Sequence, residues 1–376
     1  MNIKSLLIGS AALSAVATGA QAADAIVVPE PEPMEYVRVC DVYGAGFFYI
    51  PGTETCLKIG GYVRYQIGFS DGDFTEQDGW DKLTRATVTL DARSETEYGT
   101  LGGFIELRFQ AEGTDPVIIE GINEGDALSQ GLSSSVSRVQ QAIISLGGLS
   151  LGVADSLYDA GLSAEFDRGG ADRANFIRYT FEGGAGFSAA VALEEVDDAY
   201  DWTPNVVGKF GITQGWGGLN VWGAYDATAE EFALKAIGKF NLTQALWLEA
   251  IGTYESGINY YSVDVLDGLN FDLDSDVPRI GAEWSAGGLI GYQFNPRLKA
   301  SLGAQYFSNI GHGELTAEEV NAINVGATID YAIVENFNAK LAINYTKFDG
   351  TVDVLGGDVV TDGDQWHGFL RLQRDF

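Results

Sequence analysis

Apolar and polar residues alternate with a period of two along most of the chain. Between residues 57 and 69 the odd positions include Ile59 and Val63, while the even positions include Arg64 and Gln66. Side chains that alternate in this way belong to a β-strand with one apolar face. The same pattern predicts about 16 strands, at 57–69, 83–93, 101–110, 139–147, 149–155, 174–182, 186–195, 205–213, 218–226, 231–240, 245–254, 279–294, 297–307, 322–331, 337–348 and 366–376.

The connectors between these strands alternate in length. Short turns such as Gly147-Gly148 and Asn295-Pro296 alternate with long segments such as 111–138 and 156–173, and only the short connector 227–230 breaks the rule. Outer-membrane barrels have short periplasmic turns, long external loops and aromatic girdles. Aromatic residues near the strand ends fit such girdles: Phe69, Phe109, Phe181, Phe187, Phe210, Phe240, Phe294, Tyr306, Tyr331, Phe337 and Tyr345. We therefore expect an all-β protein, a transmembrane antiparallel up-and-down β-barrel.

Composition and charge narrow the function classes. The 376 residues include 53 acidic and 22 basic residues, with a net charge of -31, which disfavours a nucleic-acid partner. Beyond the extreme N-terminus we find no uncharged apolar run of about 18 residues, so membrane-spanning helices are not expected. The mean hydropathy of +0.02 is compatible with a barrel, because alternating faces average to near zero.

The N-terminal segment has the features of an export signal. Lys4 precedes an apolar stretch, and Ala20-Gln21-Ala22 forms a small-x-small cleavage site. Residues 1–22 are therefore expected to be a signal peptide; a short buried helix is the alternative. Residues 23–56 are interpreted as a periplasmic tether and loop, and residues 57–376 as the barrel.

The chain has two cysteines, Cys40 and Cys56. Export to an oxidising compartment allows them to pair, with a chain-entropy contribution of roughly 3 kcal/mol. A metal site is the alternative, but the only histidines, His312 and His367, lie far along the chain. We therefore expect a disulfide and no metal ligand.

The C-terminal strand ends on an aromatic residue and resembles the assembly signal of outer-membrane proteins. Phe376, Leu372 and Leu370 share one face, although Arg374 replaces a residue that is usually apolar. This resemblance implies recognition by the barrel assembly machinery and localisation in the outer membrane of a Gram-negative cell.

A family resemblance adds to this reading. The stretch YVRVCDVYGAGFFYIPGTETCLKIGGYVRY at 36–65, the signal peptide before it and the final FLRLQRDF resemble, in order, the alphaproteobacterial general porin family of the rhizobial and Brucella type. The resemblance implies a 16-stranded homotrimer in outer-membrane lipid and lipopolysaccharide. It also implies a water-filled pore for ions and small hydrophilic solutes, with the third external loop folded into the lumen.

Signatures of catalysis are missing from the sequence. There is no Walker A, HExxH, GxSxG or dinucleotide motif, so we expect no enzyme and no cofactor. Asp272, Asp274, Asp276 and Glu283 resemble the spacing of a calcium loop, but Val277 occupies the required glycine position, which favours a solvated acidic loop. A general diffusion porin is the leading interpretation; a substrate-specific channel and a barrel that is an enzyme or adhesin are the alternatives.

Basic residues, Lys235 among them, point away from the apolar strand faces, hence into the barrel. Arg64, Arg85 and Arg108 occupy three neighbouring predicted strands and form a basic wall, with Arg371 from the closing strand. If the third loop folds inward as the family implies, its acidic residues face this wall across a constriction; they are Asp155, Asp159, Glu165 and Asp167. Opposed charges there would create a transverse field, while acidic external loops would favour cations modestly, and less so at high salt.

Overall fold

The computed structural model describes residues 38–73, 79–112, 117–118, 127–128, 134–196, 203–263, 265, 281–312, 320–350, 352–354, 358–360 and 362–376. Residues 39–376 form one compact unit. The expected signal peptide, most of the expected tether, and Asp272, Asp274 and Asp276 of the acidic loop lie outside the described residues.

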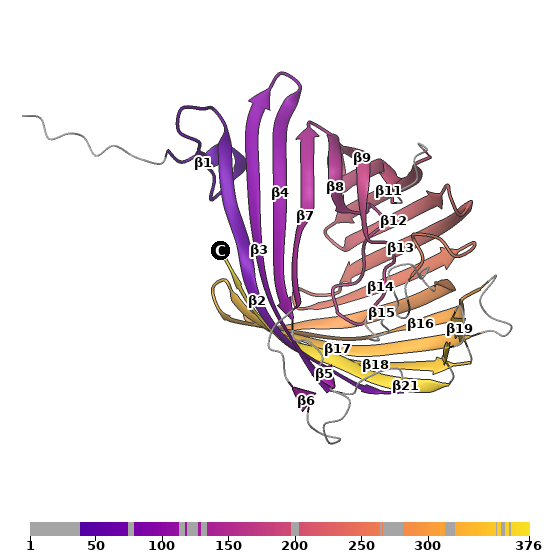
Figure 1. Cartoon of the computed structure of the whole chain (residues 1–376). Coiled ribbons are helices and arrows are strands. Elements are labelled where there is room, and N and C mark those ends of the chain that lie inside the picture. Colours follow the sequence, from indigo (N-terminus) through magenta and orange to yellow (C-terminus); the bar gives the residue numbers. More distant parts are fainter. Residues whose placement is uncertain are drawn as a thin grey trace, which may run out of the picture. The chain divides into compact units, whose positions relative to one another are not determined.

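Sixteen antiparallel strands close into a barrel (Figure 1). Each strand pairs with the next, because a turn or loop returns the chain beside the strand it has just left. The strands are β2 (Cys56–Gly72), β3 (Gly79–Thr96), β4 (Gly99–Glu112), β7 (Ser134–Leu146), β8 (Leu149–Asp155), β9 (Arg173–Glu182), β10 (Phe187–Glu195), β11 (Asn205–Gln214), β12 (Gly217–Asp226), β13 (Glu231–Asn241), β14 (Leu246–Glu255), β15 (Ala282–Asn295), β16 (Leu298–Ile310), β17 (Asn321–Val334), β18 (Phe337–Asp349) and β21 (Gly363–Asp375). The predicted barrel and its strands are confirmed.

The last strand closes the sheet against the first. β21 pairs with β2 from Tyr62↔Asp375 to Gly72↔Gln365. The Phe376 N–H donates to the Gly61 carbonyl at 3.0 Å, and the Gly61 N–H donates to the Phe376 carbonyl at 3.1 Å. The C-terminal aromatic residue therefore completes the ladder, and its side chain is exposed on the outer face.

Shorter elements were not predicted. β1 (Phe48–Tyr49) pairs with β2, and two hairpins, β5 (Val117–Ile118) with β6 (Ala127–Leu128) and β19 (Val352–Val354) with β20 (Asp358–Val360), lie in long connectors. Single-turn 3₁₀ helices occupy Asp41–Tyr43 and Gly184–Gly186. Ladders of two or three residues are too short to show a period. Among the described residues, no helix has the length and apolar character needed to cross a membrane.

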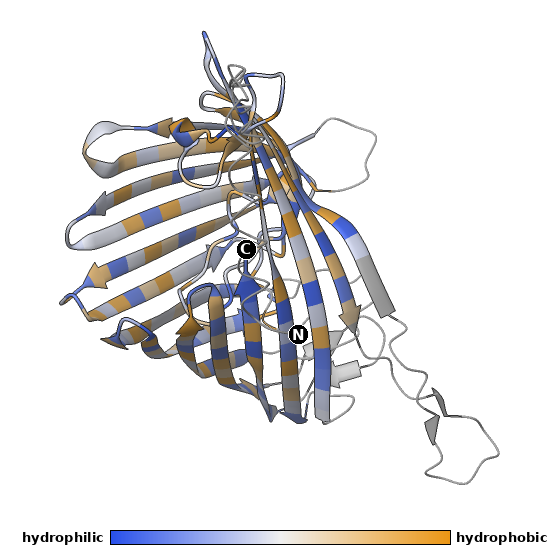
Figure 2. Ribbon diagram, turned by 90° about the vertical axis from the view of Figure 1, so that its left-hand side faces the viewer, coloured by the Kyte–Doolittle hydropathy of each residue, from blue (hydrophilic) through white to orange (hydrophobic). Residues whose placement is uncertain are grey.

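The outer face of the barrel is apolar and the inner face is polar. Figure 2 shows apolar and polar residues alternating along the strands. Aromatic pairs with at least one exposed ring lie near both ends of the strands: Phe187 with Phe210, Trp216 with Phe240, Tyr292 with Phe294, Trp284 with Tyr306, and Tyr345 with Trp366. An apolar belt between aromatic rings fits a bilayer core and its two interfaces.

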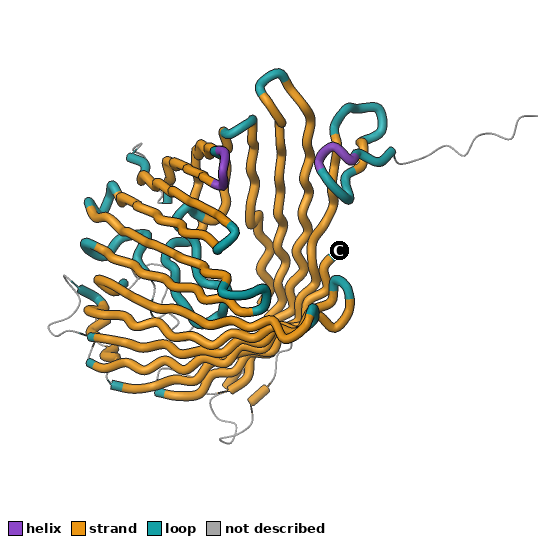
Figure 3. The backbone as a smooth tube through the Cα atoms, turned by 180° about the vertical axis from the view of Figure 1, so that it is seen from behind, coloured by secondary structure: helices purple, strands orange, loops and turns teal. Residues whose placement is uncertain are grey.

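A disulfide closes the segment that precedes the barrel. Cys40 and Cys56 are bonded, with their Cα atoms 6.0 Å apart, which confirms the predicted pairing. Both cysteines and Phe47 are buried together. The bond therefore attaches residues 40–56 to the start of β2, at the end of the barrel that carries the short turns (Figure 3).

Candidate functional site

The third long connector of the barrel, between β8 and β9, packs against the inner wall. We call residues 156–172 loop L3. Tyr158 and Phe166 of L3 are fully buried, and with Leu162 they join a cluster that includes the inward side chains Trp222 and Ile251 of the wall. Several of the largest buried side chains among the described residues therefore lie between loop and wall.

Glu194 of β10 holds the first residues of L3. Its carboxylate accepts hydrogen bonds from the Ser156 hydroxyl and from the Leu157 N–H, both at 2.7 Å. Arg178 lies 4.0 Å away on the neighbouring strand, and the Tyr261 hydroxyl donates to the same carboxylate at 3.2 Å. A fully buried carboxylate is thereby supplied with donors, which offsets the cost of burying it.

Lys235 of β13 holds the middle of the loop. Its ammonium donates to three backbone carbonyls of L3, those of Tyr158, of Ala160 at 2.9 Å and of Gly169 at 2.6 Å. It also lies 4.1 Å from the centre of the Tyr158 ring, within the range of a cation–π contact. Because these carbonyls lie on both arms of the loop, one buried side chain fixes how the loop doubles back.

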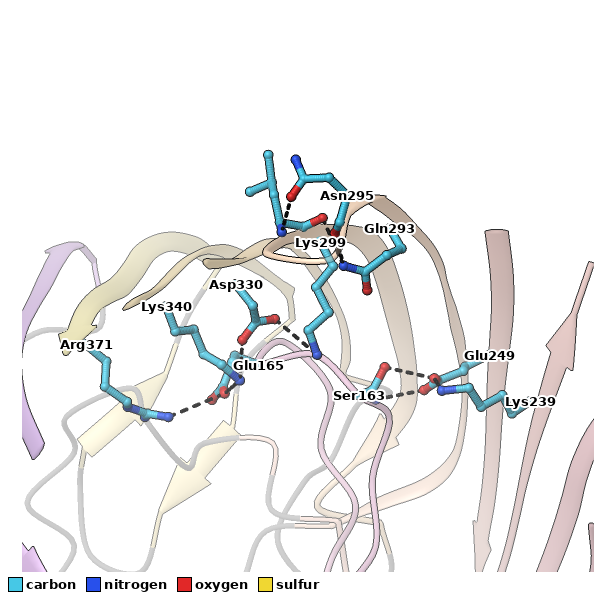
Figure 4. Close-up of polar contacts among 11 residues, drawn as sticks. Ser163, Glu165, Lys239, Glu249, Gln293, Asn295, Lys299, Asp330, Lys340 and Arg371 are labelled. Carbon is cyan, nitrogen blue, oxygen red and sulfur yellow. Dashed lines mark hydrogen bonds and ion pairs between the residues drawn. The ribbon is translucent and has the colours of Figure 1, made fainter. Parts of the chain in front are cut away.

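Glu249 of β14 and Gln305 of β16 attach further points of L3. The Ser163 N–H and hydroxyl each donate to Glu249 at 2.8 Å, and Lys239 lies 2.8 Å from the same carboxylate (Figure 4). Gln305 accepts from the Arg168 N–H at 2.8 Å and donates back to the Arg168 carbonyl at 3.1 Å.

Phe166 enters a space in the wall that glycine leaves open. A Cβ on Gly326 of β17 would lie 2.4 Å from the Phe166 Cβ, and one on Gly303 of β16 would lie 2.4 Å from the edge of its ring. The Asn324 amide donates to the Phe166 carbonyl at 2.5 Å, and the Asn344 amide donates to the Glu165 carbonyl at 3.0 Å. This anchoring determines where the adjacent Glu165 points.

Glu165 forms ion pairs with two basic residues of the wall against which the loop packs. Its carboxylate lies 2.6 Å from the Lys340 ammonium and 3.5 Å from the Arg371 guanidinium (Figure 4). Lys340 also lies 3.5 Å from Asp330, which in turn lies 3.6 Å from Lys299. Charges of both signs therefore meet where the loop reaches β18 and β21.

Three of the predicted wall arginines are held by glutamines. The Nε–H groups of Arg64, Arg85 and Arg371 donate to Gln373 at 2.9 Å, Gln110 at 2.6 Å and Gln66 at 2.9 Å. Each pair joins directly opposite residues of adjacent strands. A neutral amide orients a guanidinium without cancelling its charge. The fourth predicted residue, Arg108, lies 3.7 Å from Glu106.

The four predicted loop acids have different surroundings, and only Glu165 contacts this wall. Asp155 ends β8 opposite Arg173, and its backbone carbonyl accepts from Arg178 at 3.2 Å. Asp159 lies beside Lys235 and interacts with it electrostatically. The Asp167 carboxylate accepts from the Leu162 N–H at 2.6 Å inside the loop; burial raises the pKa of Asp167, and backbone N–H donors counteract part of that effect.

The residues that fasten L3 were not singled out from the sequence as loop anchors. Lys235 was expected only as an inward charge, and Glu194 and Glu249 were not considered. A carboxylate at an inward position of an otherwise apolar strand is a signal that could have drawn attention to them. A second loop segment also contacts L3: the Tyr261 ring lies 5.4 Å from the Tyr158 ring.

Comparisons with known proteins agree with this geometry. Residues 24–368 match the model of the porin subfamily. The chain is 37% identical, over the full length of both chains, to Porin Omp2a of Brucella melitensis biotype 1 and to Porin Omp2b of Brucella suis biovar 1. Among solved structures, the outer membrane channel DcaP of Acinetobacter baumannii has a TM-score of 0.59 at 14% identity, covering 87% of this chain and 99% of that one. A mutant of the Rh. blastica porin has a TM-score of 0.53 at 12% identity, covering 85% and 100%. These two structures share the fold.

A closed barrel with an apolar outer belt, a polar inner wall and a connector folded inside defines the class of outer-membrane porins. The chain belongs to the porin subfamily. It is an outer-membrane channel for passive diffusion of ions and small hydrophilic solutes. The relatives are named porins, which favours a diffusion channel over the substrate-specific alternative and over an enzyme.

Proposed function

We propose that L3 and the arginine wall form the constriction of the pore. The observation that supports this is the position of Glu165, which L3 carries to Lys340 and Arg371 beside Arg64. Because Glu165 touches Lys340 and Arg371 directly, the field across the passage arises between the negative charge of L3 and the guanidinium groups further along the wall, those of Arg64, Arg85 and Arg108. The low-dielectric walls strengthen this field. Such a field orients dipolar solutes and favours small polar molecules over apolar ones.

The other three predicted acids contribute to the electrostatic potential of the pore outside the contact between Glu165 and the wall. Asp155 at the end of β8 and Asp159 and Asp167 of L3 add negative charge, and the acidic external connectors concentrate cations at the mouth. Exposed charges act only within a Debye length of about 8–10 Å at physiological salt. The pore therefore has a modest cation preference that weakens as the salt concentration rises.

Processing and assembly complete the proposal. Residues 1–22 are removed as a signal peptide, and residues 23–56 form a periplasmic tether with its disulfide loop. The barrel assembly machinery recognises Phe376, Leu372 and Leu370 in the last strand. The barrels form a homotrimer in a membrane of lipid and lipopolysaccharide, and the protein has no catalytic activity. The resemblance to general porins supports each of these points.

The variant Glu165→Gln tests the constriction. It removes the charge that faces Lys340 and Arg371 while keeping the size of the side chain. In planar bilayers under a KCl gradient, we expect the reversal potential to shift toward anions and the single-channel conductance to change. Glu97→Gln is the matched control, because Glu97 is exposed in the short turn between β3 and β4. A reversal potential and conductance that match the wild type in Glu165→Gln would contradict the proposal.

A further inference from the structure

A cavity of about 490 Å³ lies in the inner wall on the short-turn side of Glu165. The ends of β15–β18 and the strands β21 and β2 form it, and Figure 4 shows several of its side chains. Its charged lining residues are Arg64, Arg297, Lys299, Asp330, Lys340 and Arg371. Short turns face the periplasm in outer-membrane barrels, so the cavity is placed toward the periplasmic exit of the pore.

Positive charge exceeds negative charge around this cavity. Five of the described lining residues are basic and one, Asp330, is acidic. Asp330 is shared between Lys299 and Lys340, and Glu165 at the cavity's edge is shared between Lys340 and Arg371. Asp375 also lies at the edge, where it accepts hydrogen bonds from the lining residues Gln373 and Asn338. With these three carboxylates counted, five cations against three anions leave a formal charge of +2.

Glutamines orient two arginines of the cavity, Arg64 and Arg371; Arg371 also lies 3.5 Å from the Glu165 carboxylate, whereas the glutamine leaves the charge of Arg64 in place. Arg64 and Arg371 each donate through Nε to a glutamine, and Gln373 is itself fixed by a hydrogen bond of 2.7 Å to Asp375. A guanidinium fixed through Nε retains its terminal N–H donors, which match the oxygen pair of a carboxylate or phosphate. The neighbouring lysines add point charges.

We propose that this cavity is a transient binding site for small oxyanions, that is, for solutes carrying a phosphate or carboxylate group. Its volume falls within the range of about 300–1,000 Å³ of small-molecule sites. It opens to the lumen, and conduction requires sites weak enough to release the solute. The site shares Arg64, Lys340 and Arg371 with the proposed constriction and extends from it toward the short turns, where Arg297 and Lys299 lie. Anionic solutes are held near the periplasmic exit, although the external mouth enriches cations.

The test uses inorganic phosphate as the probe in single-channel recordings of the full barrel. At about 0.1 M KCl, where screening is moderate, phosphate at mildly alkaline pH is added to one side at a time. We expect a saturable fall in the chloride-carried current, with a lower half-blocking concentration from the short-turn side. Lys299→Gln and Arg297→Gln are each expected to raise that concentration by about threefold to tenfold, since each removes one lining charge.

Lys209→Gln is the matched control. Lys209 faces the lumen from β11, 5.2 Å from the Trp222 ring, and does not line the cavity. Its half-blocking concentration should equal that of the wild type, and the conductance of every variant in KCl alone reports whether its barrel is intact. Block that does not saturate, or that weakens equally in Lys209→Gln, would overturn the site. The readout is a current ratio within one channel, so it remains decisive even if Glu165→Gln disproves the constriction.

Discussion

Replacing Lys235 with methionine tests whether a single buried ammonium holds L3 in the lumen. Methionine keeps an unbranched apolar stem but removes the charge and the three donors to Tyr158, Ala160 and Gly169. The pairing of β13 with β12 and β14 is made by backbone groups, so the barrel itself should fold. The loop, in contrast, is left with carbonyls that lose their donor.

The free energy by which Lys235→Met weakens the attachment of L3 can be estimated from the contacts that the variant loses. Hydrogen bonds to a charged group contribute about 1.5–3 kcal/mol each, so three contribute at most about 9 kcal/mol. Burying an ammonium costs several kcal/mol, which the methionine variant no longer bears. A net loss of about 3 kcal/mol corresponds to a shift of roughly 150-fold toward conformations in which L3 has left the wall. The contacts of Glu194 and Glu249 with the loop still retain it in part.

Single-channel recording is the assay. Lys235→Met should show a larger mean conductance and slow fluctuations between conductance levels, because the loop now moves within the lumen. Lys209→Met is the control, since it removes one lumen-facing lysine that contacts the Trp222 ring rather than L3. When propylammonium is added to the Lys235→Ala variant, it replaces the missing part of the side chain and should restore the steady conductance level of the wild type. Wild-type conductance and noise in a folded Lys235→Met barrel would refute the role of this residue.

Two further changes test the packing of L3 and the N-terminal loop. Gly326→Ala should displace the anchored part of L3 and change the conductance, because the new methyl group would lie 2.1 Å from the Asn344 Oδ1 and 2.4 Å from the Phe166 Cβ. Gly252→Ala meets only a carbonyl at 3.9 Å and should behave as the wild type. Equal conductance in the two variants would contradict the anchoring. Replacing Cys40 and Cys56 with serine removes the disulfide and should lower the stability of the segment 40–56 by about 2–5 kcal/mol. This segment should then be cleaved by protease while the barrel remains folded. Unchanged protease resistance would show that the bond does not stabilise this segment.

The strands and their orientation could be predicted from the sequence because they depend on neighbours along the chain. An alternation of apolar and polar residues assigns one face to lipid, and a one-residue slip would expose every polar side chain to the bilayer. Where the alternation fails, so does the prediction: β7 begins at Ser134 rather than 139, because the polar residues there continue the ladder with β4. The disulfide was predictable because export and only two cysteines leave one pairing.

The constriction could be predicted only in part. Strand phase placed Arg64 and Arg371 on the inner wall, and acids in the loop were the natural candidates to face them. Nothing local distinguishes Glu165 from Asp167 two positions on. Phe166, which lies between them, occupies the space above Gly326. Glu165 therefore reaches the wall, whereas Asp167 turns back to accept a hydrogen bond from the Leu162 N–H.

The alternating pattern of this sequence determined the barrel, the lipid-facing side of each strand and the sign of the charges in the lumen. The tertiary structure alone decided which of those charges meet. Glu165 and Lys340 are 175 positions apart in the chain, and their contact depends on barrel closure, on the path of L3 and on the buried ammonium of Lys235. Contacts of that kind arise from the packing of a loop on the inner wall, and no period along the sequence records which side chains meet there.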